Sequence, residues 1–191
     1  MSKSLALVAG FLSFLPFAYN QSQSPDITGV WKADLGKSKI AGPPVSDYLV
    51  IIEQKIVEVD RKTGEKGPEI NELTGIKTQR GESRALLAFL PSGKPAFRPY
   101  QGVPTRMTAS WQGNTLHLNA EVAGRPAVMQ RVYDLSPGGQ TLTVQVTQSG
   151  MGPGPEQHST IVLLKQPNSA GDPLRQPEER AEAHFKNVKI P

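Results

Sequence analysis

Arg131 and Tyr133 are the two side chains whose types and spacing carry the clearest chemistry in this sequence. Residues two apart on an extended strand point to the same face, so counting back from Leu135 places Tyr133, Arg131 and Met129 together on the expected interior face. An arginine in a mostly apolar interior needs an anion or several hydrogen-bond acceptors. The pair therefore predicts a site for a carboxylate or a similar anion.

Apolar side chains on the same and neighbouring strands are expected to complete this ligand site. The candidates beside Arg131 and Tyr133 are Met107, Trp111, Leu118, Met129 and Val144. Two other interpretations remain open. Arg131 can stack on Trp31 as a structural plug, or a β-bulge can turn its side chain outward. Neither of these would create a ligand site.

Other chemistry-bearing patterns are absent from the sequence. There is no nucleophile elbow, Walker loop, EF-hand loop or H-E-x-x-H motif. The three histidines, His117, His158 and His184, have no carboxylate or second histidine at metal-ligand spacing. We therefore assign no catalytic residue, no metal ligand and no cofactor. A hydrolase triad assembled in space from Asp134, His117 and a serine stays open as an alternative.

The elements that must position these residues are short strands joined by turns. The clearest strands lie in the second half, where Met107, Ala109 and Trp111 alternate with polar residues before a Gly113-Asn114 hairpin turn. The whole region from residue 27 to residue 165 is expected to contain about nine or ten strands at roughly ten-residue spacing. We predict an all-β protein, an antiparallel up-and-down barrel of about 8–10 strands, with a β-sandwich as the alternative.

Three local expectations in the first half are less regular. Residues 48–54 form an apolar, β-branched strand, and residues 55–61 continue it after a tight bend. Residues 70–79 are a weaker strand. Residues 96–104 are expected to be a loop, because Pro99 and Pro104 cannot donate to a strand ladder.

Composition and charge exclude several classes of protein. The chain has 191 residues with 18 Gly and 17 Pro, which favours short elements over a helical bundle. Its net charge of +4 is scattered and has no basic cluster, so we predict no nucleic-acid binding. It contains no cysteine, so no disulfide or thiolate metal site is available.

The N-terminus predicts export. Lys3 precedes a nearly continuous apolar run over residues 5–17, which suits a secretory signal and is short for a bilayer span. We assign residues 1–24 to a signal peptide and polar linker, with no transmembrane span in the mature chain. An exported chain without cysteine fits a bacterial periplasm or exterior.

The C-terminus differs from the rest of the chain. Residues 167–191 begin as a Pro-rich linker and then predict a short amphipathic helix, in which Ala181, His184, Phe185 and Val188 recur at helical spacing. Residues 177–190 are expected to dock on the barrel or on a partner in the cell envelope. The oligomeric state is not determined by these patterns.

Residues 25–166 resemble a group of exported bacterial domains of lipocalin-like type. The resemblance rests on Gly29-Val30-Trp31, on Leu35-Gly36-Lys37-Ser38-Lys39, on residues 133–142, and on a last strand that ends at Lys165. It implies an up-and-down barrel with an internal site for an apolar small molecule and no intrinsic catalysis. It also implies that Trp31 packs across the barrel floor under a basic side chain, either Arg131 or Lys165. In fatty-acid-binding barrels, distant relatives of lipocalins, an Arg-x-Tyr pair on the last strand holds the ligand carboxylate.

These observations predict an exported barrel that binds an apolar or amphipathic, and in one version carboxylated, small molecule. Two alternatives remain. The first is a non-catalytic envelope module that docks a partner through its C-terminal helix. The second is a hydrolase or isomerase on the same fold.

Overall fold

Ten strands make up the folded part of the chain. The computed structural model describes residues 24–60, 62–124, 128–150 and 154–167, so the predicted signal segment and C-terminal helix lie outside the described residues. Within these ranges, no helix is long and apolar enough to cross a membrane. The strands are β1 (Gly29–Ala33), β2 (Val45–Asp60), β3 (Glu65–Thr78), β4 (Gly81–Phe89), β5 (Ala96–Tyr100), β6 (Val103–Gln112), β7 (Thr115–Val122), β8 (Val128–Leu135), β9 (Thr141–Ser149) and β10 (Gln157–Lys165).

The strands form a single antiparallel up-and-down sheet that curls into a nearly closed barrel. Its order is β4-β3-β2-β1-β10-β9-β8-β7-β6-β5, so every hydrogen-bonded neighbour is also a neighbour in sequence except the closing pair, β1 and β10. Strands β4 and β5 are in contact but form no ladder, which leaves the barrel open at that seam. The predicted barrel is confirmed, and the continuous ladder through β1 excludes two separate sheets.

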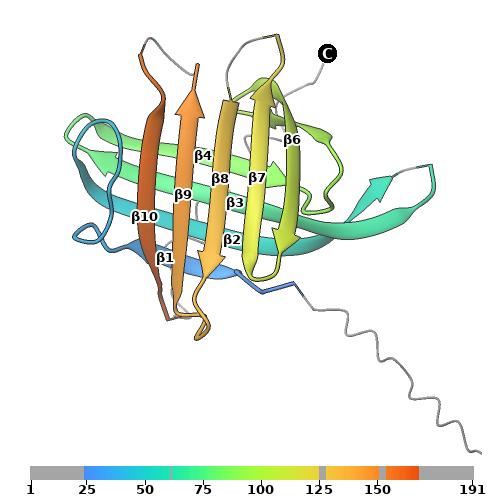
Figure 1. The fold of residues 1–191 in the computed structure, drawn as a ribbon, viewed down its shortest axis with the longest axis horizontal. Coiled ribbons are helices and arrows are strands. Elements are labelled where there is room, and N and C mark those ends of the chain that lie inside the picture. Colours follow the sequence, from blue (N-terminus) through green and yellow to red (C-terminus); the bar gives the residue numbers. More distant parts are fainter. Residues whose placement is uncertain (1–23, 61, 125–127, 151–153, 168–191) are drawn as a thin grey trace, which may run out of the picture.

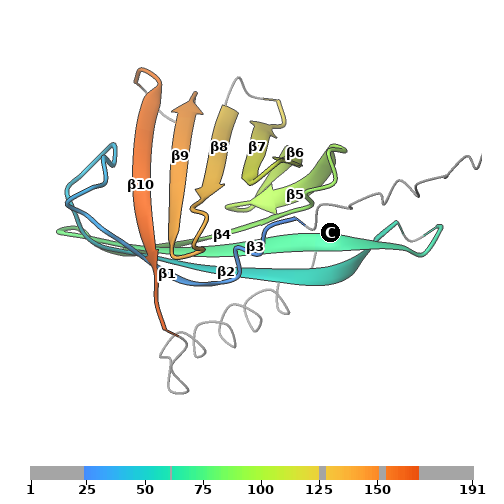
Figure 2. The same ribbon diagram turned by 60° about the horizontal axis from the view of Figure 1, so that its bottom comes forward.

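The barrel is flattened into two walls. In Figure 1, β6 to β10 stand side by side in front, and β2 to β4 cross behind them at a steep angle. Figure 2 shows the same crossing from the side, with β2 to β4 forming a base beneath the other strands. Strand twist and tilt produce such a crossing when a sheet of long strands closes on itself. The two walls therefore face each other across the interior.

Two local predictions in the first half were wrong. The expected loop at residues 96–104 is a hairpin, in which Pro99 lies opposite Pro104. The prolines are accommodated because β5 is the last strand of the sheet order. Gln101 and Gly102 both have positive φ, 50° and 76°, as the type I′ form of a two-residue hairpin turn requires. The expected bend at residue 55 is also absent, because β2 runs on to Asp60 and pairs with β3 along its length.

Strand alternation places one continuous apolar core between the walls. In the second half, most of the predicted inward positions are buried, as in Leu116, Leu118 and Ala120 on β7. The β2–β4 wall contributes Val50, Ile52 and other apolar side chains to the same cluster. The core is therefore shared by both walls, and any polar side chain on an inward position must find its partners inside.

Candidate functional site

Arg131 lies inside the barrel and meets a carboxylate that belongs to the protein. Its Nη1 atom forms a hydrogen-bonded ion pair with Glu72 Oε1. Tyr133 Oη donates to the other carboxylate oxygen, Glu72 Oε2, at 2.7 Å. Thr74 Oγ1 donates to Glu72 Oε1 at 2.9 Å. These four residues form a polar cluster that we call the Glu72 cluster.

The cluster joins the two walls. Glu72 and Thr74 lie on β3, whereas Arg131 and Tyr133 lie on β8, five places away in the sheet order. Each charged residue has apolar register partners on both sides. Glu72 lies between Ile52 and Leu87, and Arg131 lies between Leu118 and Val146. The ion pair therefore connects two rows of apolar side chains, one on each wall.

Burial and pairing set the electrostatics of the cluster. Glu72 is 2% exposed and Arg131 is 8% exposed. Burial disfavours the charge on Arg131, but the Glu72 carboxylate and the phenols around it together outweigh burial and hold the pKa of Arg131 well above its usual value. Burial also raises the pKa of Tyr133 well above that of a free phenol, and the negative charge of Glu72 adds to this effect. Tyr133 is therefore a neutral donor at any physiological pH.

Further phenols and one unused donor surround the ion pair. Burial raises the pKa of Tyr48 to about 12, with Arg131 lowering it and Glu72 raising it, so both charges act on this ring. Tyr100, on β5, is also buried and raises the pKa of Arg131. The Nε atom of Arg131 is buried and has no acceptor among the described residues. The arginine thus retains one donor that a further oxygen atom could satisfy.

Trp31 is held at a different place and by a different cation. Its ring is fully buried, and its Nε1 atom donates to the Ile27 carbonyl at 3.0 Å. Lys165, the register partner of Trp31, places Nζ 5.3 Å from the ring centroid. Gly29 has a φ of +147°, and a Cβ there would lie 3.0 Å from the Lys165 side chain. Lys165 therefore covers Trp31, and the interpretation of Arg131 as a plug on Trp31 is wrong.

The other predicted ligand-site residues lie where strand alternation placed them. Met107, Leu118, Met129 and Val144 are all buried in the shared core. Trp111 is only partly buried near the end of β6, where it packs against the core. Its buried Nε1 atom has no acceptor among the described residues. The structure brings these side chains to one interior with Arg131 and Tyr133, and whether they contact a ligand stays a prediction.

Glu72 is the functional residue that sequence reasoning missed. It lies in a stretch predicted only as a weak strand. A signal was present, because Ile70, Glu72, Thr74 and Ile76 alternate along β3 and the first and third of these are buried beside Glu72. A single carboxylate on an otherwise interior face needs a cation. The same reasoning that marked Arg131 would have marked Glu72 once β3 was assigned.

Surface hollows lie on the outside of the barrel. One extends over the outer face of β2, β3 and β4, and it is lined by Asp47, Leu49, Ile51, Leu73, Gly75, Lys77, Glu82 and Arg84. A second, shallower one lies at the end of β10, next to Lys165, Gln166 and Pro167. Neither hollow includes a residue of the Glu72 cluster.

Comparison with known proteins finds similarity only among solved structures. No family model matches the chain, and no curated protein matches its sequence. The chain is similar to secretory abundant heat soluble protein 4 from Ramazzottius varieornatus, at 11% identity and a TM-score of 0.43, over 74% of this chain and 95% of that one. It is similar to the same degree, 11% identity and a TM-score of 0.43, to a structure titled REP1-NXSQ fatty acid transporter, over 75% of this chain and 98% of that one.

Proposed function

We propose that this protein holds an apolar or amphipathic small molecule inside its barrel. The observation that carries the proposal is the Glu72 cluster, which lies in an apolar interior and keeps one buried donor, Arg131 Nε, without an acceptor. A buried donor without a partner is costly, and a ligand oxygen would remove that cost. Catalysis is not part of the proposal, because the buried polar side chains that the structure describes around Arg131 include no histidine.

The polar end of the ligand is expected to be neutral. Glu72 already balances the charge of Arg131 and accepts from Tyr133 and Thr74. A second ionised carboxylate beside Glu72 would meet a like charge at close range in a poorly hydrated site. A carbonyl or hydroxyl oxygen could accept from Arg131 Nε without that repulsion. The proposal therefore replaces the carboxylate expected from Arg131 and Tyr133 with a neutral acceptor.

Small and flexible side chains next to the cluster can make room for such a ligand. On the wall that carries Arg131, Ala120 lies between Met107 and Met129 in register, and all three are buried. Ala109 lies beside Leu118, one row closer to Arg131. Methionine side chains repack easily, because their three rotatable bonds are unbranched. We therefore place the apolar part of the ligand along the Met107–Ala120–Met129 row.

The proposed setting is outside the cytoplasm of a bacterial cell. This part of the proposal is supported by the signal-like pattern in residues 1–24 and by the lack of cysteine. An apolar cargo would need a carrier in such an aqueous compartment, because its apolar surface is disfavoured in water.

A competition experiment tests the ligand chemistry. A fluorescent long-chain fatty acid is titrated against the protein near neutral pH, and then displaced with an unlabelled long-chain alcohol or the acid of equal chain length. We expect the alcohol to displace the probe at a concentration about tenfold lower than the acid, which corresponds to ~1.4 kcal/mol. Preferential displacement by the acid would overturn the neutral-acceptor part, and absence of binding by all three would overturn the binding function.

A matched pair of variants tests the location. Ala120→Leu fills the inward row beside the methionines, whereas Asn119→Leu adds a similar side chain to the outer face of the same strand. We expect Ala120→Leu to weaken probe binding at least tenfold and Asn119→Leu to leave it unchanged. Thermal melts of both variants establish that each is folded. Equal binding by the two variants would show that the probe does not enter the barrel.

A further inference from the structure

An apolar stripe crosses the outer face of the barrel. It consists of Val30 on β1, Ile51 on β2, Leu73 on β3 and Leu86 on β4, each the register partner of the next. All four side chains are half-buried, although their positions face away from the core. The stripe runs across the strands, and part of it forms the floor of the outer hollow over β2 to β4. A row of large aliphatic side chains on the outside of a barrel indicates a covered surface.

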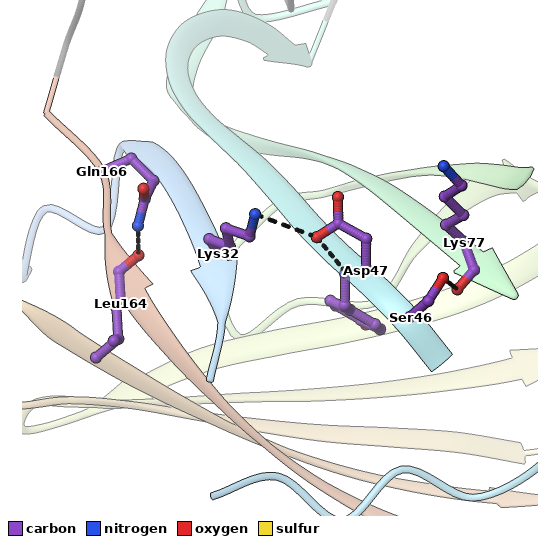
Figure 3. Close-up of polar contacts among 7 residues, drawn as sticks. Lys32, Ser46, Asp47, Lys77, Leu164 and Gln166 are labelled. Atoms are coloured by element: carbon purple, nitrogen blue, oxygen red, sulfur yellow. Dashed lines mark hydrogen bonds and ion pairs between the residues drawn. The ribbon is translucent and has the colours of Figure 1, made fainter. Parts of the chain in front are cut away.

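The described chain ends at one end of this stripe. The Gln166 amide donates to the Val30 carbonyl at 2.8 Å, so the last described residues lie next to the first stripe residue. Figure 3 shows this region, with Gln166 and Leu164 on one side of Lys32, and Asp47 on the other. The described chain therefore ends at Pro167, directly after the residue that continues the row of Val30, Ile51 and Leu73.

The length and the apolar spacing of residues 177–190 match the dimensions and the apolar character of the stripe. Ala181, His184, Phe185 and Val188 share one face of the helix predicted from the sequence. A helix of this length would extend about 21 Å, and four adjacent strands span about 14 Å between the outer two. The nine residues from 168 to 176 can reach roughly 30 Å when extended, which is ample for the distance from β10 to β2.

The rim of the hollow has charges that suit the same segment. Lys32 pairs with Asp47 at 3.5 Å, and Arg84 pairs with Glu82 at 2.8 Å, so both signs are present beside the apolar floor. The predicted helix carries three glutamates and Arg180 in its first half and two lysines in its second half. A mixed rim can pair with both halves, whereas a rim of one sign would repel one of them.

We propose that residues 177–190 dock in cis as an amphipathic helix on the outer stripe of β1 to β4, with Phe185 over Leu73. The segment then covers its own barrel and is not a free arm for an envelope partner. The proposal concerns the outer face and does not depend on a ligand inside the barrel.

Disulfide trapping tests the proposal directly, because the chain has no cysteine of its own. The test protein carries Leu73→Cys and Phe185→Cys, and the control carries Gln130→Cys and Phe185→Cys. Gln130 is exposed on β8, which belongs to the other wall. Under mild oxidation we expect an intrachain disulfide in most of the test protein and in little of the control. Equal trapping in the two proteins, or trapping only between chains as dimers, would overturn docking in cis.

Thiol labelling supplies a second measurement, which does not require a cysteine at position 185. A protein with only Leu73→Cys is labelled with a maleimide, and the same variant is prepared with Phe185→Asp added. We expect the Phe185→Asp protein to react at least tenfold faster at residue 73. A Gln130→Cys protein should react at one rate with or without Phe185→Asp. Equal rates at residue 73 in the two backgrounds would overturn the proposal.

Discussion

The barrel holds two cations at its interior, and it stabilises them in different ways. Lys165 lies over the ring of Trp31, its direct neighbour in register. Arg131 pairs with Glu72 across the full width of the barrel. Lys165 is partly exposed, so water shares its charge and an aromatic face is sufficient. Arg131 is almost fully buried and cannot lose its proton, so it requires a carboxylate.

This difference separates a contact between adjacent strands from a contact across the barrel. The Trp31 site uses residues of two adjacent strands and a glycine that leaves space for the lysine. The Glu72 cluster links strands that lie five places apart in the sheet order and ties one wall to the other. The Trp31–Lys165 contact stabilises one end of the barrel. The Arg131–Glu72 ion pair also specifies how the two walls are positioned relative to each other. The predictions below test this contrast, from the largest expected effect to the smallest.

Replacing Trp31 should produce the largest loss. Trp31→Ala removes the largest fully buried side chain and its bond to the Ile27 carbonyl. We expect the free energy of unfolding to fall by about 3–5 kcal/mol, measured by chemical denaturation. Trp111→Ala is the control, and it should cost less because Trp111 is only partly buried. Similar losses in the two variants would contradict a special role for the Trp31 site.

Breaking the ion pair from the acidic side should cost nearly as much. Glu72→Gln leaves the charge of Arg131 buried without a counterion, and we expect a loss of about 3–4 kcal/mol in the free energy of unfolding. Arg131→Met should cost less, because it leaves no arginine behind, and an unpaired buried arginine cannot become neutral by losing its proton.

The double variant Glu72→Leu with Arg131→Met tests whether the ion pair itself stabilises the fold, or whether the loss in Glu72→Gln comes from an unpaired buried charge. It removes both charges together but also the acceptor of the Tyr133 and Thr74 hydroxyls, so we expect it to be more stable than Glu72→Gln and about 1–3 kcal/mol less stable than the wild type. A double variant as unstable as Glu72→Gln would show that the pair itself, and not an unpaired charge, determines stability.

Alkaline pH should weaken the fold through Tyr48. Its pKa is raised by burial from 10.0 to about 12, so the unfolded chain ionises at lower pH than the folded one. The stabilising effect is complete below pH 10 and is lost as pH rises toward 12. Two pKa units correspond to roughly 2–3 kcal/mol. Unfolding curves at several pH values for wild type and Tyr48→Phe check this, and equal slopes would contradict it.

Removing the lysine over Trp31 should have the smallest effect. Lys165→Met keeps an unbranched chain over the ring but removes the charge, so we expect a loss of about 0.5–1 kcal/mol in unfolding free energy. If Lys165→Met lost as much unfolding free energy as Glu72→Gln, the two cation sites would contribute equally to stability. That result would contradict the difference proposed between them.

Much of the interior could be predicted because strand alternation is a local property. Once Leu135 was assigned inward, the directions of Arg131 and Tyr133 followed from chain geometry, and both are buried. The hairpin at Gly113-Asn114 was predicted from its two turn residues, and Gly113 has the positive φ of 61° that such a turn needs. Membership of a lipocalin-like family, bacterial origin, and export remain predictions.

The errors arose where context overrides local preference. Two prolines argued against a strand at residues 96–104, but β5 is the end of the sheet order and needs donors on one side only. The apparent bend near residue 55 was read from residue types, whereas pairing with β3 keeps β2 extended to Asp60. Both corrections depend on which strand lies alongside, which neighbouring residues do not encode.

The amino-acid sequence alone predicted that Arg131 points into an all-β interior and needs an acceptor there, because alternation and the cost of an unpaired charge are both local arguments. The identity of that acceptor emerged only from the folded barrel. Glu72 reaches Arg131 because closure through β1 and β10 brings β3 and β8 face to face. The same closure gave Trp31 its lysine, from the far end of the folded chain. Contacts across a closed sheet depend on the strand order and on the register stagger. Both are set by the barrel as a whole and not by neighbouring residues in the sequence.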